Sequence, residues 1–367
     1  MAELKVALVH DFLTQWGGGE YVLKVFSEIY PDAPIYVINY DQKIVDEFLP
    51  KRKVIASFLQ HFPGMPKSFK YWLSFMPRAI ESFDLSDFDV VLSDSSAYAK
   101  GVITRPPTKH ICYLHTPTRY LWSDYQSYVA SAPIPLPLIG QPVVKTILRF
   151  LRRWDLIAAK RPDYLIANSE YIAKRTRQYY QRQPDSVLFP PVDCGRFKIS
   201  SKLGDYFLVV GRQEPYKKTD LAIQAANELG LKLKVVGGGT KLGELKAIAG
   251  PTVEFTGRVS DEELVELYAN CQAFIFPPKE DAGITPLEAM ASGRPVIAYG
   301  EGGALESVVA GVTGEFFPEQ TVESLVNALK NFDPKKYDPK KIRAHALKFD
   351  AKLFKDKIRQ IVSGETV

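Results

Sequence analysis

Short apolar runs alternate with helical patterns along most of this chain, and the alternation restarts once near the middle. Such alternation is typical of a parallel β-sheet whose strands are joined by crossover helices. The strands predicted for the first half are Val6–His10, Ala33–Ile38, Val54–Ile55, Val90–Ser93, His110–Leu114 and Tyr164–Asn168. Those predicted for the second half are Tyr206–Val210, Lys232–Val236, Val253–Thr256, Ala273–Phe276 and Pro295–Ala298. The sequence therefore predicts an α/β protein with two parallel sheets.

Paired prolines mark the break between the two series, in the segment Leu188–Asp193. Prolines at this position favour a stiff linker. A chain of 367 residues also exceeds the roughly 100–200 residues of one ordinary domain. We therefore predict an N-terminal Rossmann-like domain over residues 1–192 and a second Rossmann-like domain over residues 193–345. A C-terminal helix and tail, residues 346–367, should pack back towards the first domain, and a cleft should separate the two domains.

Composition excludes several classes of protein. Met1–Lys5 leads directly into the first apolar segment, which is unlike a signal peptide, and no apolar run approaches the ~20 residues that span a bilayer. Cys112, Cys194 and Cys271 are odd in number and far apart, which favours a reducing compartment. No Cys and His spacing resembles a zinc site. We therefore expect a cytoplasmic location.

The net charge of +5 lies in the first half of the chain. Up to Val192 there are 23 Lys and Arg against 18 Asp and Glu, and after it there are 24 of each. Basic residues and large apolar side chains interleave in Phe48–Ile80 and again in Val143–Arg161. A charge run is usually a solvated face, but this mixture also suits an anionic membrane surface. We predict peripheral attachment at the inner face of the cell membrane, and no nucleic-acid partner. The basic residues concerned are Lys51, Arg52, Lys53, Lys67, Lys70, Arg78, Lys145, Arg149, Arg152, Arg153, Lys160 and Arg161.

Glycines follow the first predicted strand and open a helix, at Gly17, Gly18 and Gly19. Glycines at such a turn let backbone amides approach a phosphate at the helix N-terminus, although a simple tight turn explains them equally well. The spacing is not G-x-G-x-x-G, which disfavours a standard dinucleotide fold. Asp11, just past the same strand, is a candidate for binding an acceptor.

Basic residues follow the first strand of the second half. Gly211 and Arg212 end that strand, and Lys217 comes five residues later. At the carboxyl end of a parallel strand, Arg and Lys can hold a diphosphate without a metal ion. Taken alone, a pair of surface cations is the simpler interpretation.

Two glutamates eight residues apart surround the next candidate site, at Glu280 and Glu288. One carboxylate could bind sugar hydroxyls and the other ribose hydroxyls. The backbone amides of Gly283, Ile284 and Thr285 could point at a phosphate between them. The alternative for Glu288 is a favourable interaction with the helix dipole.

An acidic pair of D-x-D form occurs at Asp87 and Asp89. Metal-binding pairs of this kind should follow a strand, whereas these residues precede one. We interpret them as a turn that enters the strand. The sequence therefore predicts no metal and no cofactor apart from the sugar-nucleotide substrate.

Together these elements resemble the retaining glycosyltransferases of family 4, which have the GT-B fold. The resemblance runs from Lys5 to about Gly314 and is most specific over Glu280–Ala298. Tyr113–Trp122, Pro215–Lys218 and Ala298–Glu306 also look like the mannosyltransferase branch that uses GDP-mannose. Two departures on the acceptor side are Thr118, where Met is expected, and Ser123, which separates Trp122 from an acid.

The resemblance implies roles for individual residues. The residues implied in catalysis are His115, Arg212, Lys217 and Glu280. Those implied in donor binding are Gly18, Gly19, Gly211, Arg258, Val259, Ala282, Gly283, Ile284, Thr285 and Glu288. Those implied in acceptor binding are Asp11, Arg119, Tyr120 and Trp122.

The predicted function is transfer of a hexose with retention of its anomeric configuration onto a glycan or polyprenyl-linked acceptor, in polysaccharide or glycolipid synthesis. Mannose from GDP-mannose is the preferred prediction for the transferred sugar. The residues leave three further functions open. They are a transferase with a UDP-sugar donor, a nucleotide-sugar epimerase on the same architecture, and a non-catalytic nucleotide-sugar-binding module.

Overall fold

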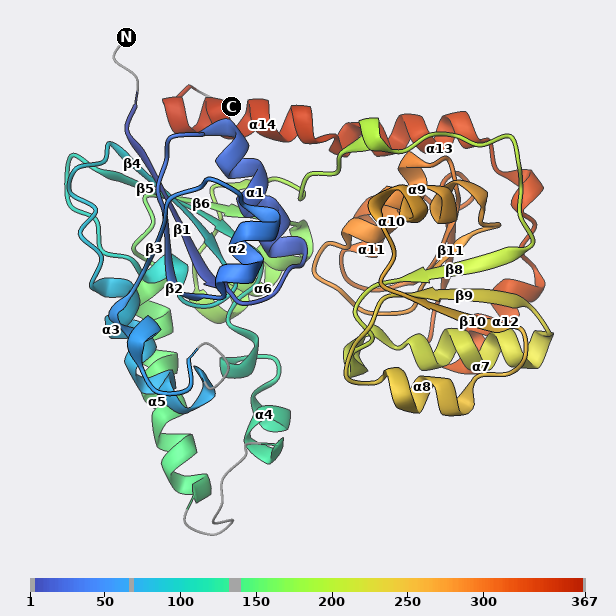
Figure 1. Cartoon of the computed structure of the whole chain (residues 1–367), viewed down its shortest axis with the longest axis horizontal. Coiled ribbons are helices and arrows are strands. Elements are labelled where there is room, and N and C mark those ends of the chain that lie inside the picture. The colour runs from blue at the N-terminus through green and yellow to red at the C-terminus, as the bar shows by residue number, and fades with distance from the viewer. Residues whose placement is uncertain (1–3, 66–68, 132–139, 366–367) are drawn as a thin grey trace. The chain divides into compact units, whose positions relative to one another are not determined.

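The protein is described here by a computed structural model that covers residues 4–65, 69–131 and 140–365 (Figure 1). The chain forms two compact units. Unit 1 comprises Met1–Phe189 and Lys355–Val367, and unit 2 comprises Pro190–Phe354. The division after Phe189 falls inside the proline-containing segment Leu188–Asp193, three residues before the boundary that we placed after Val192.

Unit 1 contains a seven-stranded sheet in which every strand pair is parallel. The strand order is β3-β2-β1-β4-β5-β6-β7. Its central strands are buried along almost their whole length, as expected when helices cover both faces. The strands are β1 (Val6–Leu13), β2 (Ile35–Tyr40), β3 (Val54–Ala56), β4 (Val90–Ser95), β5 (Lys109–Leu114), β6 (Tyr164–Ala167) and β7 (Ser186–Val187).

Helices join these strands, as predicted. The α-helices are α1 (Gly18–Ile29), α2 (Gln42–Phe48), α3 (Met76–Glu81), α4 (Tyr125–Ser131), α5 (Gly140–Ala158) and α6 (Glu170–Tyr180). Short 3-10 turns follow β3, β4 and β5 at Phe58–His61, Ala99–Gly101 and Arg119–Leu121. The chain also forms a 3-10 turn at Phe69–Phe75, just before α3.

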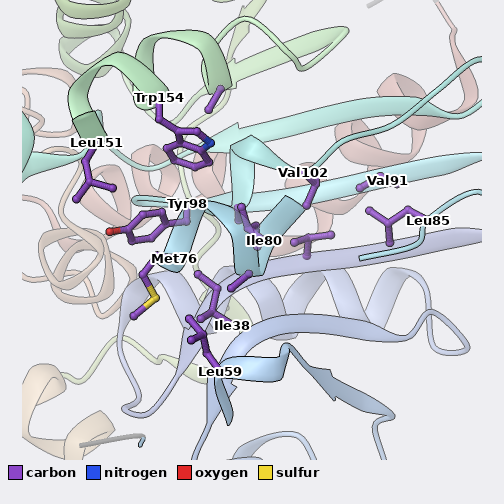
Figure 2. Close-up of a cluster of buried hydrophobic side chains, with 14 of the residues drawn as sticks. Ile38, Leu59, Met76, Ile80, Leu85, Val91, Tyr98, Val102, Leu151 and Trp154 are labelled. Atoms are coloured by element: carbon purple, nitrogen blue, oxygen red, sulfur yellow. The ribbon is translucent and has the colours of Figure 1, made fainter. Parts of the chain in front are cut away.

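One face of this sheet carries a hydrophobic core, part of which is shown in Figure 2. Leu59, Met76 and Ile80 pack there with Tyr98 and Trp154. Phe62, Met65 and Trp72, from the basic and aromatic segment Phe48–Ile80, pack against the same core. The aromatic residues of that segment are therefore divided between the core and the surface, where Phe58, Tyr71 and Phe75 are exposed. Lys67 lies outside the described residues, and the side chain of Lys70 is not described.

Unit 2 contains a six-stranded sheet, again parallel throughout, with the order β10-β9-β8-β11-β12-β13. The strands are β8 (Tyr206–Val210), β9 (Lys232–Val236), β10 (Val253–Gly257), β11 (Phe274–Phe276), β12 (Val296–Tyr299) and β13 (Gly314–Phe317). The helices are α7 (Thr219–Leu229), α8 (Leu242–Ile248), α9 (Asp261–Asn270), α10 (Ile284–Ala291), α11 (Ala304–Ser307), α12 (Val322–Lys330) and α13 (Pro339–Ala346), and α14 (Ala351–Ser363) begins in this unit.

The start of α9 illustrates the local signals from which the helices could be predicted. Ser260 is the N-cap, and its hydroxyl accepts a hydrogen bond from the Glu263 amide at 3.2 Å. Three acidic residues then fill the first turn, where the helix dipole favours negative charge. The helix accordingly begins at Asp261, as its sequence predicts.

The C-terminal helix α14 is shared between the two units, since its residues from Lys355 onwards belong to unit 1. Lys355 Nζ lies 2.7 Å from Glu28 Oε2 on α1. The end of the chain is therefore a helix that packs with the first domain, as predicted. Residues 346–354, which we had grouped with it, belong to unit 2.

Candidate functional site

Strand order reverses at one place in each sheet. In unit 1 the chain places β2 and β3 on one side of β1 and β4 to β7 on the other. In unit 2 the corresponding reversal lies between β8 and β11. Ligands of doubly wound sheets bind outside the carboxyl ends of the strands at such a reversal. These two places are therefore where the predicted site residues should gather.

The reversal in unit 2 opens into a pocket. It is lined by residues 209–213 at the end of β8, by residues 274–278 at the end of β11, and by Lys217 and Thr219. Three residues that the sequence pointed to, Gly211, Arg212 and Lys217, thus lie in one pocket. This arrangement suits a phosphorylated ligand, because Arg212 and Lys217 are cationic.

Lys217 forms an ion pair with Glu280, through Nζ and Oε1. The two side chains are 18% and 17% exposed, so the pair is neither fully buried nor fully solvated. Glu280 follows β11 in a loop, while Lys217 ends the 3-10 turn Pro215–Lys217 after β8. The structure therefore brings together two residues that are 63 positions apart in the chain.

Two glycines fix the loop that carries Glu280. The amide of Gly303 donates to the Glu280 carbonyl at 2.8 Å. A Cβ on Gly303 would lie 2.4 Å from Ala282 Cα, and one on Gly302, whose φ is +72°, would lie 2.3 Å from the Glu280 oxygen. Any other residue at either position would displace this loop, since real Cβ contacts are never so short. The predicted donor residue Ala282 is buried in it.

A third glycine contact supports the end of β8 and was missed by the sequence analysis. Gln213 is 1% exposed, and its Nε2 donates to the carbonyls of Gly211 at 2.8 Å and Val236 at 3.0 Å. A Cβ on Gly237 would lie 2.2 Å from the Gly211 oxygen. The signal was present in the sequence, as the three consecutive glycines 237–239 directly after a strand.

Helix α10 presents its N-terminus and one carboxylate. Gly283 is the N-cap with φ +83°, so the helix starts at Ile284 and leaves the first amides without intrahelical partners. Glu288 lies one turn into the helix and accepts a hydrogen bond from the Tyr268 hydroxyl at 2.8 Å. Burial raises the pKa of the Glu288 carboxyl above its usual range. The carboxylate thus has a fixed orientation, and Thr285 is half-buried at the start of the same helix.

Arg258 and Val259 follow β10, two strands away from β8. Arg258 is exposed and Val259 is half-buried. The Gly257 carbonyl accepts a hydrogen bond from the Gly237 amide at 2.7 Å, which connects this turn to the glycine loop after β9. Both residues thus lie at the carboxyl edge of the sheet, and their predicted role in donor binding stays a prediction.

The reversal in unit 1 holds two histidines and one carboxylate. Asp94, at the end of β4, is fully buried, with Oδ2 2.9 Å from His10 Nδ1 and Oδ1 hydrogen-bonded to His115 Nε2. Gly18 and Gly19 open α1 beside them, and a Cβ on Gly19 would lie 3.5 Å from His115 Nε2. The sequence analysis identified His115 and the glycines but neither His10 nor Asp94.

Charge explains the protonation of this cluster. Burial alone lowers the pKa of His10, but the hydrogen bond and the negative charge of Asp94 outweigh it and raise that pKa to about 9. Burial would raise the pKa of Asp94, and the two histidines reverse the effect and lower it. We infer a buried carboxylate that stays ionised between two imidazole rings.

The structure assigns Asp11 a different role from the one predicted. Its two carboxylate oxygens accept hydrogen bonds from four consecutive backbone amides, those of residues 96–99, at 2.6 to 2.8 Å. The side chain is 4% exposed. Asp11 therefore anchors the turn after β4, and these four bonds use the lone pairs that an acceptor hydroxyl would need.

The predicted acceptor segment lies on the 3-10 turn after β5. Trp122 Nε1 donates to Asp155 Oδ2 at 2.7 Å, and Asp155 also forms a fully buried ion pair with Lys100 at 2.6 Å. The Tyr120 hydroxyl is paired with that of Tyr98. The polar atoms of Tyr120 and Trp122 thus hold the turn to α5 and to the core. A direct contact with an acceptor would use their rings, or the half-buried Arg119 beside them.

The D-x-D pair lies at the amino end of β4, opposite to the carboxyl edge that holds the candidate site of unit 1. Asp89 accepts a hydrogen bond from the Lys5 amide at 2.8 Å, at the amino end of β4. Within residues 4–65, 69–131 and 140–365, no three His, Cys, Asp or Glu side chains gather as a metal site would require. His110 is buried and bonds Ser93 at 2.8 Å, and burial lowers its pKa to about 3, in agreement with a structural role.

With this geometry in place, comparison with known proteins defines the class. Residues 35–196 match the model of Glycosyltransferase Family 4, and residues 196–348 match that of Glycosyl transferases group 1. The chain belongs to the family 4 glycosyltransferases.

Curated relatives in this family include mannosyltransferases. The mouse alpha-1,3/1,6-mannosyltransferase ALG2 is 31% identical over 190 residues, which cover 41% of this chain and 46% of the relative. The O-antigen chain mannosyltransferase C of Escherichia coli is 29% identical over 200 residues, covering 49% of this chain and 52% of the relative. The chain thus spans about half the length of the curated relatives that it matches.

Solved structures share the fold over nearly the whole chain. The Anabaena protein Alr3699/HepE in complex with UDP and glucose superimposes with a TM-score of 0.72 at 19% identity, covering 98% of this chain and 100% of that chain. Sucrose-phosphate synthase from Thermosynechococcus elongatus gives a TM-score of 0.72 at 15% identity, covering 98% of each chain. The predicted GT-B fold, with two Rossmann-like domains, is confirmed. Across the part of the chain that the structure describes, none of the helices has the length and apolar character to cross a membrane.

Proposed function

We propose that the protein is a retaining, metal-independent hexosyltransferase that moves mannose from GDP-mannose onto a glycan or polyprenyl-linked acceptor. The observation that carries the proposal is the pocket in unit 2. It lies at the reversal between β8 and β11 and combines Arg212 and Lys217 with Glu280 from the neighbouring loop. A pocket with two cations and a carboxylate fits a diphosphate joined to a sugar.

In this proposal each residue near the pocket has one task. Arg212 and Lys217 stabilise the negative charge that develops on the leaving diphosphate, together with the first amides of α10. One such donor contributes ~3–4 kcal/mol in comparable oxyanion sites. Glu280 binds sugar hydroxyls and Glu288 binds ribose hydroxyls. The anomeric bond breaks first, and the departing phosphate accepts the proton of the acceptor hydroxyl, so no enzymic nucleophile is required.

The donor is proposed from the relatives. A third relative, the GDP-mannose-dependent alpha-(1-6)-phosphatidylinositol monomannoside mannosyltransferase of Mycolicibacterium smegmatis, is 32% identical over 176 residues, covering 41% of this chain and 46% of the relative. A UDP-sugar is the alternative donor, because the HepE structure contains UDP and glucose.

A thermal-shift panel separates the two donors. At a ligand concentration of 100 Kd the folded state gains about 2.7 kcal/mol, so the true donor stands out from the rest. We expect GDP-mannose to raise the melting temperature more than UDP-glucose, UDP-N-acetylglucosamine or ADP-glucose. A larger shift with any UDP-sugar would replace mannose transfer from GDP-mannose with transfer from that donor.

Reaction products distinguish a transferase from an epimerase and from a binding module. A transferase moves label from the donor to an acceptor, an epimerase changes the free or nucleotide-linked sugar without an acceptor, and a binding module does neither. We further expect transfer to survive excess EDTA, because Arg212 and Lys217 would supply the charge that a metal otherwise provides. Complete loss with EDTA and recovery with Mg²⁺ or Mn²⁺ would contradict metal independence.

We also propose that unit 1 attaches to the inner face of an anionic membrane through α5. Val143, Phe150 and Ile157 recur every seven residues on this helix and are 54–60% exposed. Arg149 and Arg153 are exposed on the same helix. An apolar stripe beside basic residues is the pattern of a helix that lies in a membrane interface, where each basic residue contributes about 1 kcal/mol.

Flotation with vesicles tests this attachment. We expect binding to vesicles of about 30% phosphatidylserine at low salt and release near ~0.5 M salt, where the screening length falls to a few Å. Replacing Phe150 and Ile157 with Ser should abolish flotation. Replacing Leu305 and Leu353 with Ser is the matched control, since these side chains are 55% and 51% exposed elsewhere. Equal flotation of both double variants would contradict the role of α5.

A further inference from the structure

We propose that Asp94 is a positioning residue for the reaction, holding the His115 ring at the reversal of the first sheet with His10 as its second partner. The proposal rests on the proposed glycosyl transfer and on the catalytic role that the family resemblance implies for His115. It adds Asp94, a residue that neither the sequence motifs nor the family matches indicated, to the candidate site.

The sheet itself brings the three side chains together. β1 and β4 are neighbours with His10 opposite Asp94 in register, and β5 lies on the other side of β4 with Tyr113 opposite Asp94. His115 is therefore the second residue beyond that partner, at the carboxyl edge. This edge is also where strand order reverses, between β1 and β4. The cluster thus lies where a doubly wound sheet binds ligands.

Both oxygens of Asp94 are in use. Oδ2 lies 2.9 Å from His10 Nδ1, and Oδ1 bonds His115 Nε2. Because Asp94 binds Nε2 of His115, Nδ1 is the ring nitrogen that remains to meet a reactant. A carboxylate bonded to one imidazole nitrogen fixes the tautomer and the direction of the other. His115 keeps 12% of its side chain exposed, so this ring is the member of the cluster that a ligand can reach.

The surroundings argue against a purely structural role. An ionised carboxylate is costly to bury, and the other five residues of β4 are equally buried without a charge. Burial of this strand therefore does not require a carboxylate. The other charged groups near the cluster are Glu20 on α1 and Asp11 on β1, both of which act on His10. Tyr113 closes the other side, with its ring edge-on to His115 at 5.2 Å.

A double-mutant cycle tests whether Asp94 acts through His115. The variants are Asp94→Asn, His115→Gln and the combination, with Ser93→Ala as the matched control on the same strand. We expect Asp94→Asn to lower kcat roughly 10- to 100-fold, as expected when a reacting imidazole loses its orienting carboxylate. Affinity for the nucleoside diphosphate should stay within about twofold, because that ligand binds unit 2. In the His115→Gln background the second change should cost less than about threefold.

Three results of this cycle would overturn the proposal. One is losses in kcat that multiply in the double variant. Another is a loss of diphosphate affinity in Asp94→Asn as large as the loss of kcat, since a global structural defect would produce it. If Ser93→Ala lowers kcat as much as Asp94→Asn does, the effect belongs to the strand and the proposal is wrong.

Nitrogen-15 spectra of the wild-type protein provide a test that does not need Asp94→Asn to fold or the donor to be known. We expect a slowly exchanging Nε2–H resonance of His115 that is absent in His115→Gln. A His115 ring whose Nε2–H exchanges freely with water would overturn the proposal. If no sugar nucleotide supports transfer but this resonance is present, the proposed function fails while the Asp94–His115 bond stands.

Discussion

Removing the Glu280 carboxylate should strengthen the binding of a nucleoside diphosphate without its sugar. In the structure Glu280 pairs with Lys217, the cation that we assign to the leaving phosphate. A diphosphate that enters the pocket must therefore compete with Glu280 for Lys217. With the sugar attached, its hydroxyls would occupy the carboxylate and offset the competition. Glu280→Gln removes the charge and leaves the shape of the side chain.

The size of the effect follows from the exposure of the pair. Two unit charges at 4 Å interact by about 4 kcal/mol at an effective dielectric constant of 20, whereas exposed pairs contribute ~0.2–1 kcal/mol in measured cycles. Side chains that are 18% and 17% exposed lie between these limits. We take about 1–2 kcal/mol, which corresponds to an affinity for the diphosphate roughly 5- to 30-fold higher in Glu280→Gln.

Titration calorimetry with GDP, or with UDP if the donor panel selects it, measures this change. The matched control is Glu301→Gln, because Glu301 forms a comparable but more exposed pair with Lys279 nearby, with side chains 44% and 45% exposed. That control should change the affinity less than twofold. Equal or weaker binding of the diphosphate to Glu280→Gln would refute the reasoning, because it would mean that Glu280 does not restrain Lys217.

Three further predictions follow from particular contacts. Gly303→Ala should weaken diphosphate binding at least about tenfold by calorimetry, because the new Cβ would meet Ala282 Cα at 2.4 Å. The control Gly300→Ala should change the affinity little, because the nearest neighbour of its Cβ is 3.5 Å away. Asp11→Asn should lower the free energy of unfolding in urea by about 3 kcal/mol, because the amide can accept only part of the four hydrogen bonds, while Asp41→Asn, at an exposed helix cap, should cost under ~0.5 kcal/mol. Since the pKa of His10 is raised to about 9, its contribution is fully present below pH 6.5 and is lost as the pH rises through 9. The stability of the wild type should therefore fall over this window by on the order of 3 kcal/mol more than that of His10→Gln, and equal slopes would contradict the pairing with Asp94.

The fold was predictable from the sequence because its signals are local. Strands β8 and β9 begin and end at the predicted residues, and the N-cap Ser260 marks the start of α9. The two strands that escaped prediction lack such a signal. β7 has two residues, Ser186–Val187, and β13 starts with glycine and includes Glu315. Both are strands because a neighbouring strand offers hydrogen bonds, which is information from elsewhere in the chain.

The candidate sites divide in the same way. Gly211, Arg212, Lys217 and Glu280 are recognisable because each follows a strand that the sequence reveals. Asp94 is not recognisable from the sequence, because it lies inside the buried strand Val90–Ser95. Only the pairing of β4 with β1 places it beside His10. For Asp11 the local signal suggested binding of an acceptor, because the residue follows a predicted strand. Four backbone amides that are 85 to 88 residues away in the chain instead bind its carboxylate.

The central claim is that the pocket in unit 2 binds the donor of a glycosyl transfer reaction. Transfer of labelled sugar from the donor to acceptor, measured for Arg212→Ala and Glu288→Ala beside the wild type, tests it most directly. We predict a loss of more than about 100-fold in both variants, each still folded at the assay temperature, which corresponds to more than ~2.7 kcal/mol of transition-state stabilisation. Folded variants that retain a tenth of the wild-type rate, a loss of only ~1.4 kcal/mol, would contradict the claim.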